Sequence, residues 1–497
     1  MEARQATDTP FLKSFPKQLL IDGCWKNSRS GDVFETLNPA NGQCMATVQK
    51  ASASDVDDAV AAARAAFEGE WRRWNPFQRQ ELLLRIADLV DRNFEELAWL
   101  DTLDMGAPIS RLRNGRQRII GLLRFYAGMA TAIHGETIPN SVPGSVFSYT
   151  LAEPVGVVGA ILPWNGPLGM AVWKLAPALA TGCTIVMKPS EESPLSALRL
   201  GELLVEAGVP AGVVNILPGG GECGAAIAAH QGVDKVSFTG STETGQRIVQ
   251  ASAGNLKRLS LELGGKSPNI VFPDANLELA AAGAAAAIFS NSGQICSAGS
   301  RLFVHESIYD SFLEQVVERA QTLHLGDGAD PSTTIGPVVS GKQYERILRY
   351  LELGKKEGAT AVSGGFPVRD GAMEKGWFIA PTVFRDVQDD MAIAREEIFG
   401  PVLSALSFRD TDEVIRRAND SQFGLGAGLW TKDVNKAHYV SSRLRTGSVW
   451  VNTYQAMDPA VPFGGYKASG YGRESGRQHL EEFLNTKAVW LRIEDDE

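Results

Sequence analysis

The sequence predicts an α/β protein with a doubly wound parallel-sheet domain followed by a second α/β domain. From residue 155 onward, short apolar runs such as VGVVGAILPW (155–164) alternate with amphipathic segments such as PLSALRLGELLVEAG (194–208). Buried strands that alternate with helices are typical of βαβ units and of a parallel sheet covered on both faces. The chain of 497 residues also exceeds the roughly 250–300 residues at which a single core stops growing, so several domains are expected.

Helical patterns dominate the region before residue 155. SASDVDDAVAAARAAFEGEW (52–71) opens with capping residues and continues as an Ala-rich helix. The amphipathic stretch 76–106 predicts one long helix or a pair of helices, which end at Gly106. Alternation in SVFSYTL (145–151) predicts a strand.

The segments after residue 155 divide into two series. In the first series, strands are expected near 155–164, 184–190, 213–221 and 235–241, with helices near 171–182, 194–208, 224–230 and 243–253. In the second series, strands are expected at 301–305, 400–408 and 446–452, with helices near 275–290, 309–323 and 342–358. We detect no internal repeat.

The composition gives no indication of a polyanionic partner. Hydrophobic residues make up 44% of the chain, charged residues 21%, and the formal net charge is -10. Nucleic acids and anionic membrane surfaces attract clustered Lys and Arg, so neither is an expected partner. We interpret the most basic run, RLRNGRQR (111–118), as a solvated helix face.

The cysteines and the apolar runs lead us to expect a cytoplasmic protein. Five cysteines are scattered without CxxC spacing, which disfavours a disulfide framework and a metal site. The first residues lack the apolar core of a secretory signal. The most apolar run, 279–289, is shorter than the roughly 20 residues that span a bilayer.

Glycine patterns at two predicted strand ends are suited to a dinucleotide. PGGGECG contains G-x-G-x-x-G at Gly219, Gly221 and Gly224, where backbone N–H groups at a helix N-terminus face a pyrophosphate. A plain tight turn is the alternative interpretation. Gly240 and Ser241 in FTGST occupy the same kind of position one unit later.

Lys188 and Glu191 follow a third predicted strand. An acidic residue at this position accepts hydrogen bonds from ribose hydroxyls and repels a 2′-phosphate, so Glu191 favours NAD over NADP. Either residue alone is equally compatible with an ordinary surface charge. Three such strand ends in one sheet together predict an NAD site.

Cys296 lies in NSGQICSAGS (291–300), among small and polar residues that cannot build a core. A free cysteine is usually a buried structural residue, but these flanks suit an accessible and nucleophilic sulfur. Glu262 in LELGGKSP and Asn165 in LPWNGP end other predicted strands, as a candidate base and a candidate oxyanion donor. None of the six histidines has a spacing that makes it a base for Cys296.

Taken together, these stretches resemble the aldehyde dehydrogenase superfamily over nearly the whole chain. The motifs occur in the family's order and spacing: LPWN, KPSE, FTGST, LELGGKSP, GQICSAGSR, EEIFGPV and PFGGYKASGYGRE. The separation of 34 residues between Glu262 and Cys296 is among the most diagnostic features of the resemblance.

The resemblance implies a mechanism of aldehyde oxidation. Cys296 attacks the aldehyde carbonyl as thiolate, and the Asn165 side chain and the Cys296 backbone N–H hold the oxyanion. Hydride passes to NAD, and Glu262 activates the water that hydrolyses the thioester to a carboxylic acid. Lys174 and Glu474 match positions that relay protons near the base.

The resemblance also implies how NAD is bound. Lys188 and Glu191 bind the adenosine ribose, Gly240 and Ser241 lie at the pyrophosphate, and Glu397 and Phe399 hold the nicotinamide end; Pro163, Trp164, Gly220 and Gly224 complete the expected cofactor residues. The Gly pattern is one residue shorter here than the family's usual GFGPTAG. Its glycines therefore rank below Gly240 and Ser241 as cofactor contacts.

The expected substrate pocket is wide and apolar. Gly166 and Ser290 stand where many relatives carry aromatic residues, and Gly169 follows in the same stretch. The apolar lining is expected from Met170, Trp173, Phe289, Ile295, Met457 and Phe463. These features predict a bulky aromatic or medium-to-long aliphatic aldehyde, unless a side chain from elsewhere refills the space.

The resemblance implies three structural parts and an oligomer. We expect an NAD-binding domain of residues 1–132 and 152–264, a catalytic domain of residues 265–467, and an oligomerisation arm and tail of residues 133–151 and 468–497. The arm is a β-hairpin that joins subunits into a homodimer or homotetramer.

Three other functions remain as alternatives. A CoA-acylating semialdehyde dehydrogenase keeps the fold but commonly lacks a base at the position of Glu262. A thiol esterase uses Cys296 without redox chemistry. A non-catalytic protein on the same fold has no physical need for Cys296, Glu262 and Asn165 together.

Overall fold

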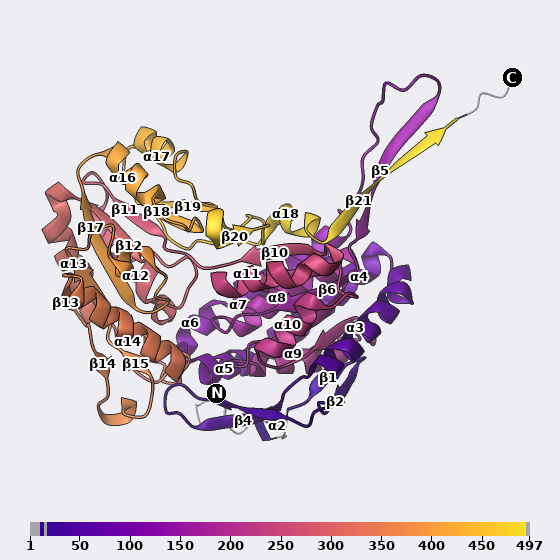
Figure 1. The fold of residues 1–497 in the computed structure, drawn as a ribbon, viewed down its shortest axis with the longest axis horizontal. Helices are drawn as coiled ribbons and strands as arrows, with labels where there is room; N and C mark the ends of the chain where they lie inside the picture. Colours follow the sequence, from indigo (N-terminus) through magenta and orange to yellow (C-terminus); the bar gives the residue numbers. More distant parts are fainter. Residues whose placement is uncertain (1–9, 14–16, 494–497) are drawn as a thin grey trace.

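An eight-stranded sheet forms the centre of the first lobe (Figure 1). In this computed structural model, which describes residues 10–13 and 17–493, five central strands run parallel, and three short edge strands are antiparallel to their neighbours. In spatial order, the strands are β2 (Cys24–Lys26), β1 (Leu19–Ile21), β8 (Val214–Ile216), β7 (Thr184–Lys188), β6 (Val157–Ile161), β9 (Lys235–Thr239), β10 (Arg258–Glu262) and β20 (Gly470–Tyr471).

The order of these strands creates a switch point between β6 and β9. The chain moves outward from β6 through β7 to β8 and then returns to the other side of β6 at β9. Helices leave β6 and β9 on opposite sides of such a point, which opens a crevice at the carboxyl ends of the strands. The doubly wound parallel sheet predicted from the sequence is confirmed.

Side-chain alternation along the strands builds one core on each face of this sheet. Val158 and Ala160 face one cluster, while Val157 and Ile161 face the other, as the two-residue period of a strand requires. The first face is covered by α4 (Pro76–Arg92), α5 (Phe94–Met105), α7 (Arg116–Ala130), α8 (Pro167–Thr181) and α9 (Leu195–Glu206), and the second by α3 (Ala53–Glu68), α10 (Gly221–Ala229) and α11 (Thr242–Ala251).

The stretch 76–106 forms a pair of helices. Asn93 separates α4 from α5, and α5 ends at Gly106, which adopts φ +83°. A Cβ at Gly106 would lie 2.7 Å from the ring of Pro337, so only glycine satisfies both the left-handed backbone and the close contact. The short helix α6 (Ile109–Asn114) follows directly.

A seven-stranded sheet forms the second lobe, with six parallel strands and one antiparallel edge strand. Its spatial order is β13 (Thr360–Ser363), β16 (Thr382–Arg385), β17 (Val402–Phe408), β12 (Arg301–His305), β11 (Pro268–Val271), β18 (Gly426–Trp430) and β19 (Ser448–Val451). The helices of this lobe are α12 (Leu277–Phe289), α13 (Tyr309–Gln321), α14 (Gly341–Lys356), α15 (Ala392–Arg395), α16 (Thr411–Asn419) and α17 (Val434–Ser441). Two hydrophobic clusters fill its two faces.

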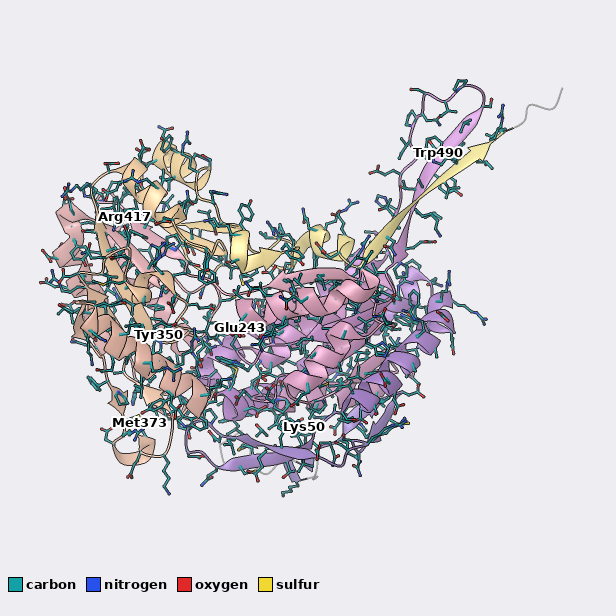
Figure 2. The ribbon with its side chains drawn as sticks, in the orientation of Figure 1. Lys50, Glu243, Tyr350, Met373, Arg417 and Trp490 are labelled. Atoms are coloured by element: carbon teal, nitrogen blue, oxygen red, sulfur yellow. The ribbon has the colours of Figure 1, made fainter. Side chains whose placement is uncertain are left out.

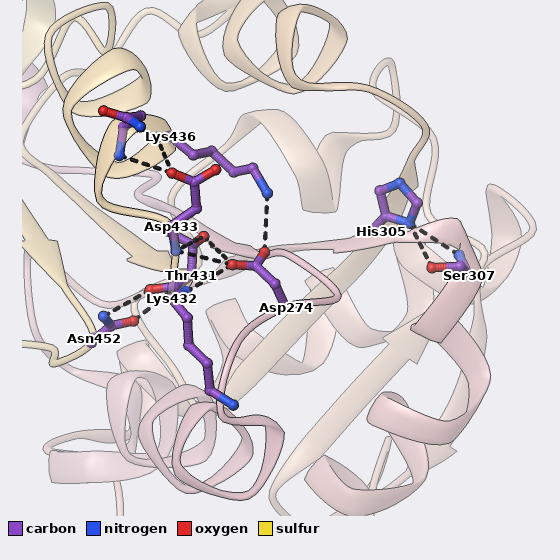
Figure 3. A network of polar contacts seen from close by, with 9 residues as sticks. Asp274, His305, Ser307, Thr431, Lys432, Asp433, Lys436 and Asn452 are labelled. Carbon is purple, nitrogen blue, oxygen red and sulfur yellow. Dashed lines mark hydrogen bonds and ion pairs between the residues drawn. The ribbon is translucent and has the colours of Figure 1, made fainter.

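Asp274 fixes the ends of two neighbouring strands in this second sheet (Figure 3). Its carboxylate, just after β11, accepts hydrogen bonds from the Thr431 hydroxyl at 2.6 Å and the Lys432 backbone N–H at 2.8 Å, both just after β18. The Lys436 ammonium lies 3.0 Å away. These donors hold the pKa of Asp274 well below its usual range, despite partial burial.

A two-stranded ribbon projects from the first lobe (Figure 1). Strand β5 (Val146–Pro154) pairs antiparallel with β21 (Leu484–Arg492), and residues 136–138 run along the other edge of β5. Apolar side chains remain exposed on this ribbon, among them Trp490 at 59% (Figure 2). The remaining elements are β3 (Val33–Leu37), β4 (Cys44–Gln49), β14 (Pro367–Val368), β15 (Phe378–Ile379) and α18 (Gly476–Glu481).

The two sheets follow the division at about residue 264, with one difference. Strand β20 adds to the first sheet although its residues were assigned to the arm and tail. The expected domain boundaries also include residues 1–9, 14–16 and 494–497, which lie outside the described residues. The exact boundaries stay a prediction.

Two negative findings apply to the described part of the chain. No helix within residues 10–13 and 17–493 is long and apolar enough to cross a bilayer. The same residues contain no cluster of His, Cys, Asp or Glu that could hold a metal ion.

Candidate active site

The loop that carries Cys296 is built from small residues because it must turn tightly against another loop. Asn291, Ser292 and Gly293 adopt positive φ values of 54°, 55° and 73° between α12 and β12. A Cβ at Gly293 would lie 1.9 Å from the carbonyl oxygen of Gly400. The polar run therefore serves the local backbone geometry as well as access to the sulfur.

The loop after β10 lies directly against the loop of Cys296. A Cβ at Gly265 would stand 2.4 Å from the Cys296 carbonyl oxygen. Glycine at this position lets the two backbones approach closely. Glu262 ends β10 three residues before Gly265. The contact between the two loops therefore brings Glu262 into the neighbourhood of Cys296, which lies 34 positions later in the sequence.

Asn165 is held beside the same loop by hydrogen bonds. Its side-chain N–H donates to the Gln294 carbonyl at 2.9 Å, two residues before Cys296. The Asn291 side chain donates to the Asn165 backbone carbonyl at 3.1 Å and to the Gln294 carbonyl at 3.2 Å. The amide of Asn165 keeps a second N–H for another acceptor.

The carboxylate of Glu262 is buried with neither oxygen hydrogen-bonded within the described residues. Its side chain lies close to Gly464, where a Cβ would stand 2.7 Å from Oε1. The ammonium of Lys174, on α8, forms a fully buried ion pair with Glu474. Buried polar groups normally have partners, so a carboxylate with none is poised for a ligand or a water molecule.

Burial and like charges raise the pKa of both the thiol and the carboxyl. Burial raises the pKa of Cys296, and the nearby Glu262, Glu397 and Glu474 carboxylates raise it further. Burial and Glu474 also raise the pKa of Glu262 well above its usual range, while Lys174 opposes the shift. Cys296 is half-buried, so it stays partly exposed.

Residues suited to an adenosine and a pyrophosphate lie along the carboxyl edge of the first sheet. Lys188 ends β7 and makes an ion pair with Glu191 at 3.1 Å. Helix α10 begins after Gly220 without a side-chain cap, so its first N–H groups stay free of protein acceptors on side chains. Ser241 caps α11 by accepting from the Thr244 N–H at 3.2 Å.

The glycines at this edge of the sheet differ in how much space a side chain would find there. A Cβ at Gly221 would meet nothing, and one at Gly224 would make ordinary contacts with the side chains of Lys188 and Ile161. At Gly240, by contrast, a Cβ would lie 2.4 Å from the ring of Phe238. Of these three glycines, only Gly240 would bring a Cβ into close contact with another side chain, and the ranking of these glycines as cofactor contacts stays a prediction.

Glu397 and Phe399 lie where the two lobes meet. The Glu397 carboxylate accepts from the Gly265 N–H at 3.0 Å, next to the loop of Cys296. Burial raises its pKa to about 7. Phe399, which adopts φ 59°, packs edge-on against Trp164 with ring centroids 5.2 Å apart. Pro163 and Trp164 directly follow β6.

The residues expected to line a substrate pocket flank the first turns of α8. A Cβ at Gly166 would meet nothing within 4 Å, whereas one at Gly169 would lie 3.9 Å from Ile119. Trp173 and Phe463 have ring centroids 6.2 Å apart. Met170, Ser290, Ile295 and Met457 are half-buried, and Phe289 is fully buried.

Several supporting residues escape sequence reasoning. Asn291 and Gln294 hold Asn165, Gly464 borders Glu262, and Ser475 accepts from the Trp173 indole N–H at 3.1 Å. These residues lie within motifs that the sequence identifies as a whole, and a motif does not show which of its members contact the site residues.

The thiol of Cys296 lies beside the Asn165 amide and the unpaired Glu262 carboxylate at the crevice of a doubly wound sheet, where proteins of this architecture bind nucleotides. The chain belongs to the aldehyde dehydrogenase family, whose family model matches residues 25–489. The resemblance noted in the sequence is thus confirmed, and the protein is an oxidoreductase of this family.

Similar proteins cover almost the full chain. Human retinal dehydrogenase 2 is 50% identical over 98% of this chain and 93% of its own length. A Bacillus cereus aldehyde dehydrogenase, solved with NAD+, is 49% identical with a TM-score of 0.95 over 97% of this chain and 98% of its own. Betaine aldehyde dehydrogenase of Staphylococcus aureus, also solved with NAD+, is 40% identical with a TM-score of 0.96 over 99% and 97%. The cofactor of both solved relatives agrees with the predicted NAD.

The charge around the thiol can be tested by alkylation. We predict that Glu262→Gln shifts the midpoint of the pH profile for iodoacetamide alkylation of Cys296 downward by about one pH unit, because a negative charge that opposes the thiolate is lost. The alkylation rates of the wild type and of Glu262→Gln are expected to differ only above the pH at which Glu262 ionises, because a protonated Glu262 carries no charge.

The matched control is Glu222→Gln, which removes an exposed carboxylate paired with Lys50. Alkylation of Cys296 is followed by peptide mapping in each protein. An unchanged or upward-shifted midpoint in Glu262→Gln would contradict this electrostatic description.

Proposed function

We propose that the protein oxidises a bulky hydrophobic aldehyde to the carboxylic acid with NAD, through a thiohemiacetal and a thioester on Cys296. The observation that carries the proposal is the placement of the Cys296 loop against both Asn165 and the loop of Glu262. A nucleophile, an oxyanion donor and a base are the three groups that this reaction needs.

The first step is addition of the Cys296 sulfur to the aldehyde carbonyl. The free N–H of the Asn165 amide and the Cys296 backbone N–H, which has no acceptor in the described part of the chain, point to the two oxyanion donors. Losing one such donor typically slows a reaction about 10²–10³-fold. Because the thiol pKa is raised, the thiolate is a minor but strongly nucleophilic form.

The NAD site runs from Lys188 and Glu191 at the adenosine ribose to Glu397 and Phe399 at the nicotinamide. Gly240, Ser241, Gly220, Gly224, Pro163 and Trp164 line the length between these ends. When bound, NAD supplies the acceptor for the hydride that leaves the carbon attached to Cys296. Glu191, which is exposed at the ribose end, disfavours a 2′-phosphate.

The second half-reaction releases the acid. Glu262 takes a proton from water, which then attacks the thioester on Cys296. The buried pair of Lys174 and Glu474 lies beside Glu262 and influences its pKa in both directions. We assign this pair to proton transfer away from the base.

The buried base favours water over other acyl acceptors. A CoA-acylating enzyme has no use for a carboxylate that activates water, and the burial of Glu262 near the thiol adds a cost that such an enzyme avoids. Thiol esterase activity requires no residues at a nicotinamide end, to which we assign Glu397, whose carboxylate accepts from the Gly265 N–H.

The size of the substrate follows from the open space at Gly166. A Cβ at Gly166 would meet nothing within 4 Å, and we assign this open space to a bulky substrate. Trp173 and Phe463 keep the wall apolar. The relatives are named for retinal and for betaine aldehyde, so their names alone do not select a substrate.

The projecting ribbon supports a homodimer or homotetramer. An isolated two-stranded ribbon is marginally stable in water, and β5 and β21 expose Phe147, Leu151, Trp490 and Leu491. We assign these side chains to contacts with a second copy of the chain. The five free cysteines fit a reducing compartment, and we propose the cytoplasm.

The role of Glu262 predicts a separation of the two half-reactions. In Glu262→Gln, a first burst of NADH close to one per Cys296 is expected on mixing with NAD and an aromatic aldehyde, because addition and hydride transfer do not need the base. Steady-state turnover falls about 10²–10⁴-fold, and no acyl-CoA forms when CoA is added to the wild type. Stopped-flow absorbance measures both phases, and undiminished turnover would refute the assigned base.

The role of Gly166 predicts a change of substrate size. Gly166→Phe places a ring in the open channel, so kcat/KM for phenylacetaldehyde and octanal is expected to fall at least about tenfold relative to acetaldehyde. The matched control is Gly128→Phe, also at a position with open space but on the exposed face of α7. Equal losses for all aldehydes, or a wild type that prefers acetaldehyde, would contradict the wide pocket.

A further inference from the structure

Ser475 adopts a backbone conformation that residues with a side chain rarely take. Its φ of 61° and ψ of 168° lie in a region that is almost restricted to glycine. A residue in this region is stable only where its surroundings hold it in place. Ser475 directly follows Glu474, which forms the buried ion pair with Lys174. The strained position is therefore next to the pair that we assign to proton transfer.

Hydrogen bonds hold Ser475 and Glu474 on the side of the proposed substrate pocket. Glu474 and Phe463 exchange two backbone hydrogen bonds, at 2.6 and 2.7 Å. The Ser475 hydroxyl accepts from the Trp173 indole N–H at 3.1 Å. These contacts leave the backbone N–H of Ser475 for another acceptor.

His479 supplies this acceptor. The Ser475 N–H donates to Nδ1 of His479 at 3.2 Å, and the Tyr126 hydroxyl lies 3.1 Å from the same nitrogen. Because a backbone N–H can only donate, Nδ1 is unprotonated and the imidazole carries its proton on Nε2. His479 is fully buried on α18, a helix that packs against α8 (Figure 1).

The surroundings of His479 favour the neutral imidazole that this hydrogen bond needs. Burial and the nearby Lys174 and Lys235 lower the pKa of His479 well below its usual range. A neutral ring keeps the lone pair on Nδ1, whereas an imidazolium would direct an N–H toward the N–H of Ser475. His479 therefore remains an acceptor at neutral pH.

Packing alone gives no reason for a histidine at this position. The ring packs edge-on against Tyr126 and Phe483, with ring centroids 5.8 and 5.3 Å apart. Nε2 is buried without a hydrogen-bond partner among the described residues, and such burial is costly. An apolar side chain would fill the same space without this cost, so the acceptor at Nδ1 is what histidine contributes here.

We propose that His479 is a positioning residue for the second half-reaction: by accepting the Ser475 N–H, it holds the backbone in the conformation that directs the Glu474 carboxylate to Lys174. This inference rests on the proposed function and adds a residue that touches neither substrate nor cofactor. It also explains why the strained conformation of Ser475 persists beside the ion pair.

Loss of the acceptor should slow the release of the acid. The Ser475 N–H would then be buried and unpaired, and the backbone would relax toward a more common conformation. The Glu474 carboxylate would move relative to Lys174, so the proton that Glu262 takes from water would leave more slowly. The thioester on Cys296 would therefore persist for longer.

The test compares two substitutions of similar size. His479→Leu removes the acceptor, whereas His479→Asn places an amide oxygen near the position of Nδ1. With saturating NAD and an aromatic aldehyde, kcat is measured from NADH formation, and the fraction of Cys296 that carries an acyl group at steady state is measured by mass spectrometry after an acid quench. We expect kcat to fall about tenfold in His479→Leu and to stay within about threefold of the wild type in His479→Asn. The acylated fraction in His479→Leu should equal or exceed that of the wild type.

The acylated fraction separates positioning from a loss of structure, because misfolded protein carries less acyl group. His438→Leu, which replaces an exposed histidine on α17, is the control and should match the wild type. If His479→Leu does not fold, His479→Gln takes its place with the same expectation, since its amide oxygen reaches toward the position of Nε2.

Three results would overturn the role of His479: an unchanged kcat without the acceptor, a fall in the acylated fraction, or a His479→Asn protein as slow as His479→Leu. Absence of both NADH and an acyl group on Cys296 in the wild type would instead overturn the proposed function.

Discussion

The proposed chemistry depends on a carboxyl group that is buried close to a thiol. Glu262 has no hydrogen-bond partner in the described residues and lies close to Glu474, so its charged form is disfavoured. Burial and nearby carboxylates also raise the pKa of the Cys296 thiol. A raised pKa makes the ionised form of each group a stronger base than the free group, and a carboxylate whose pKa is raised is suited to general base catalysis.

Parallel sheets make this arrangement possible because their strands end at one edge. Strands β6 and β10 deliver Asn165 and Glu262 to the carboxyl edge of the first sheet, and the loop before β12 delivers Cys296 from the second lobe. Glycines at 265 and 293 then allow backbones to touch. The proposed site therefore lies between the two lobes.

Much of this organisation could be predicted from the sequence, because strand and helix periods depend on local residues alone. The parallel sheets, the pair of loops around Cys296 and Glu262, and the family itself follow from patterns and motifs. The contacts that a residue makes in the folded protein do not follow from such patterns. The run 111–118 has the composition of a solvated face, and only packing separates Arg113, which meets Glu95, from Arg118, which meets Met457. Composition also does not give a pKa. Polar neighbours predict an accessible thiol at position 296, and only the fold shows that Cys296 is partly buried.

The central claim is that an acyl group is carried on Cys296 and removed by water that Glu262 activates. The most direct measurement is mass spectrometry of the Glu262→Gln protein, quenched in acid soon after mixing with NAD and an aromatic aldehyde. The account predicts a mass increase of one acyl group per chain, mapped to the peptide that contains Cys296 and absent when NAD is omitted. NADH formation without any adduct on this peptide, or an adduct on another cysteine, would contradict it.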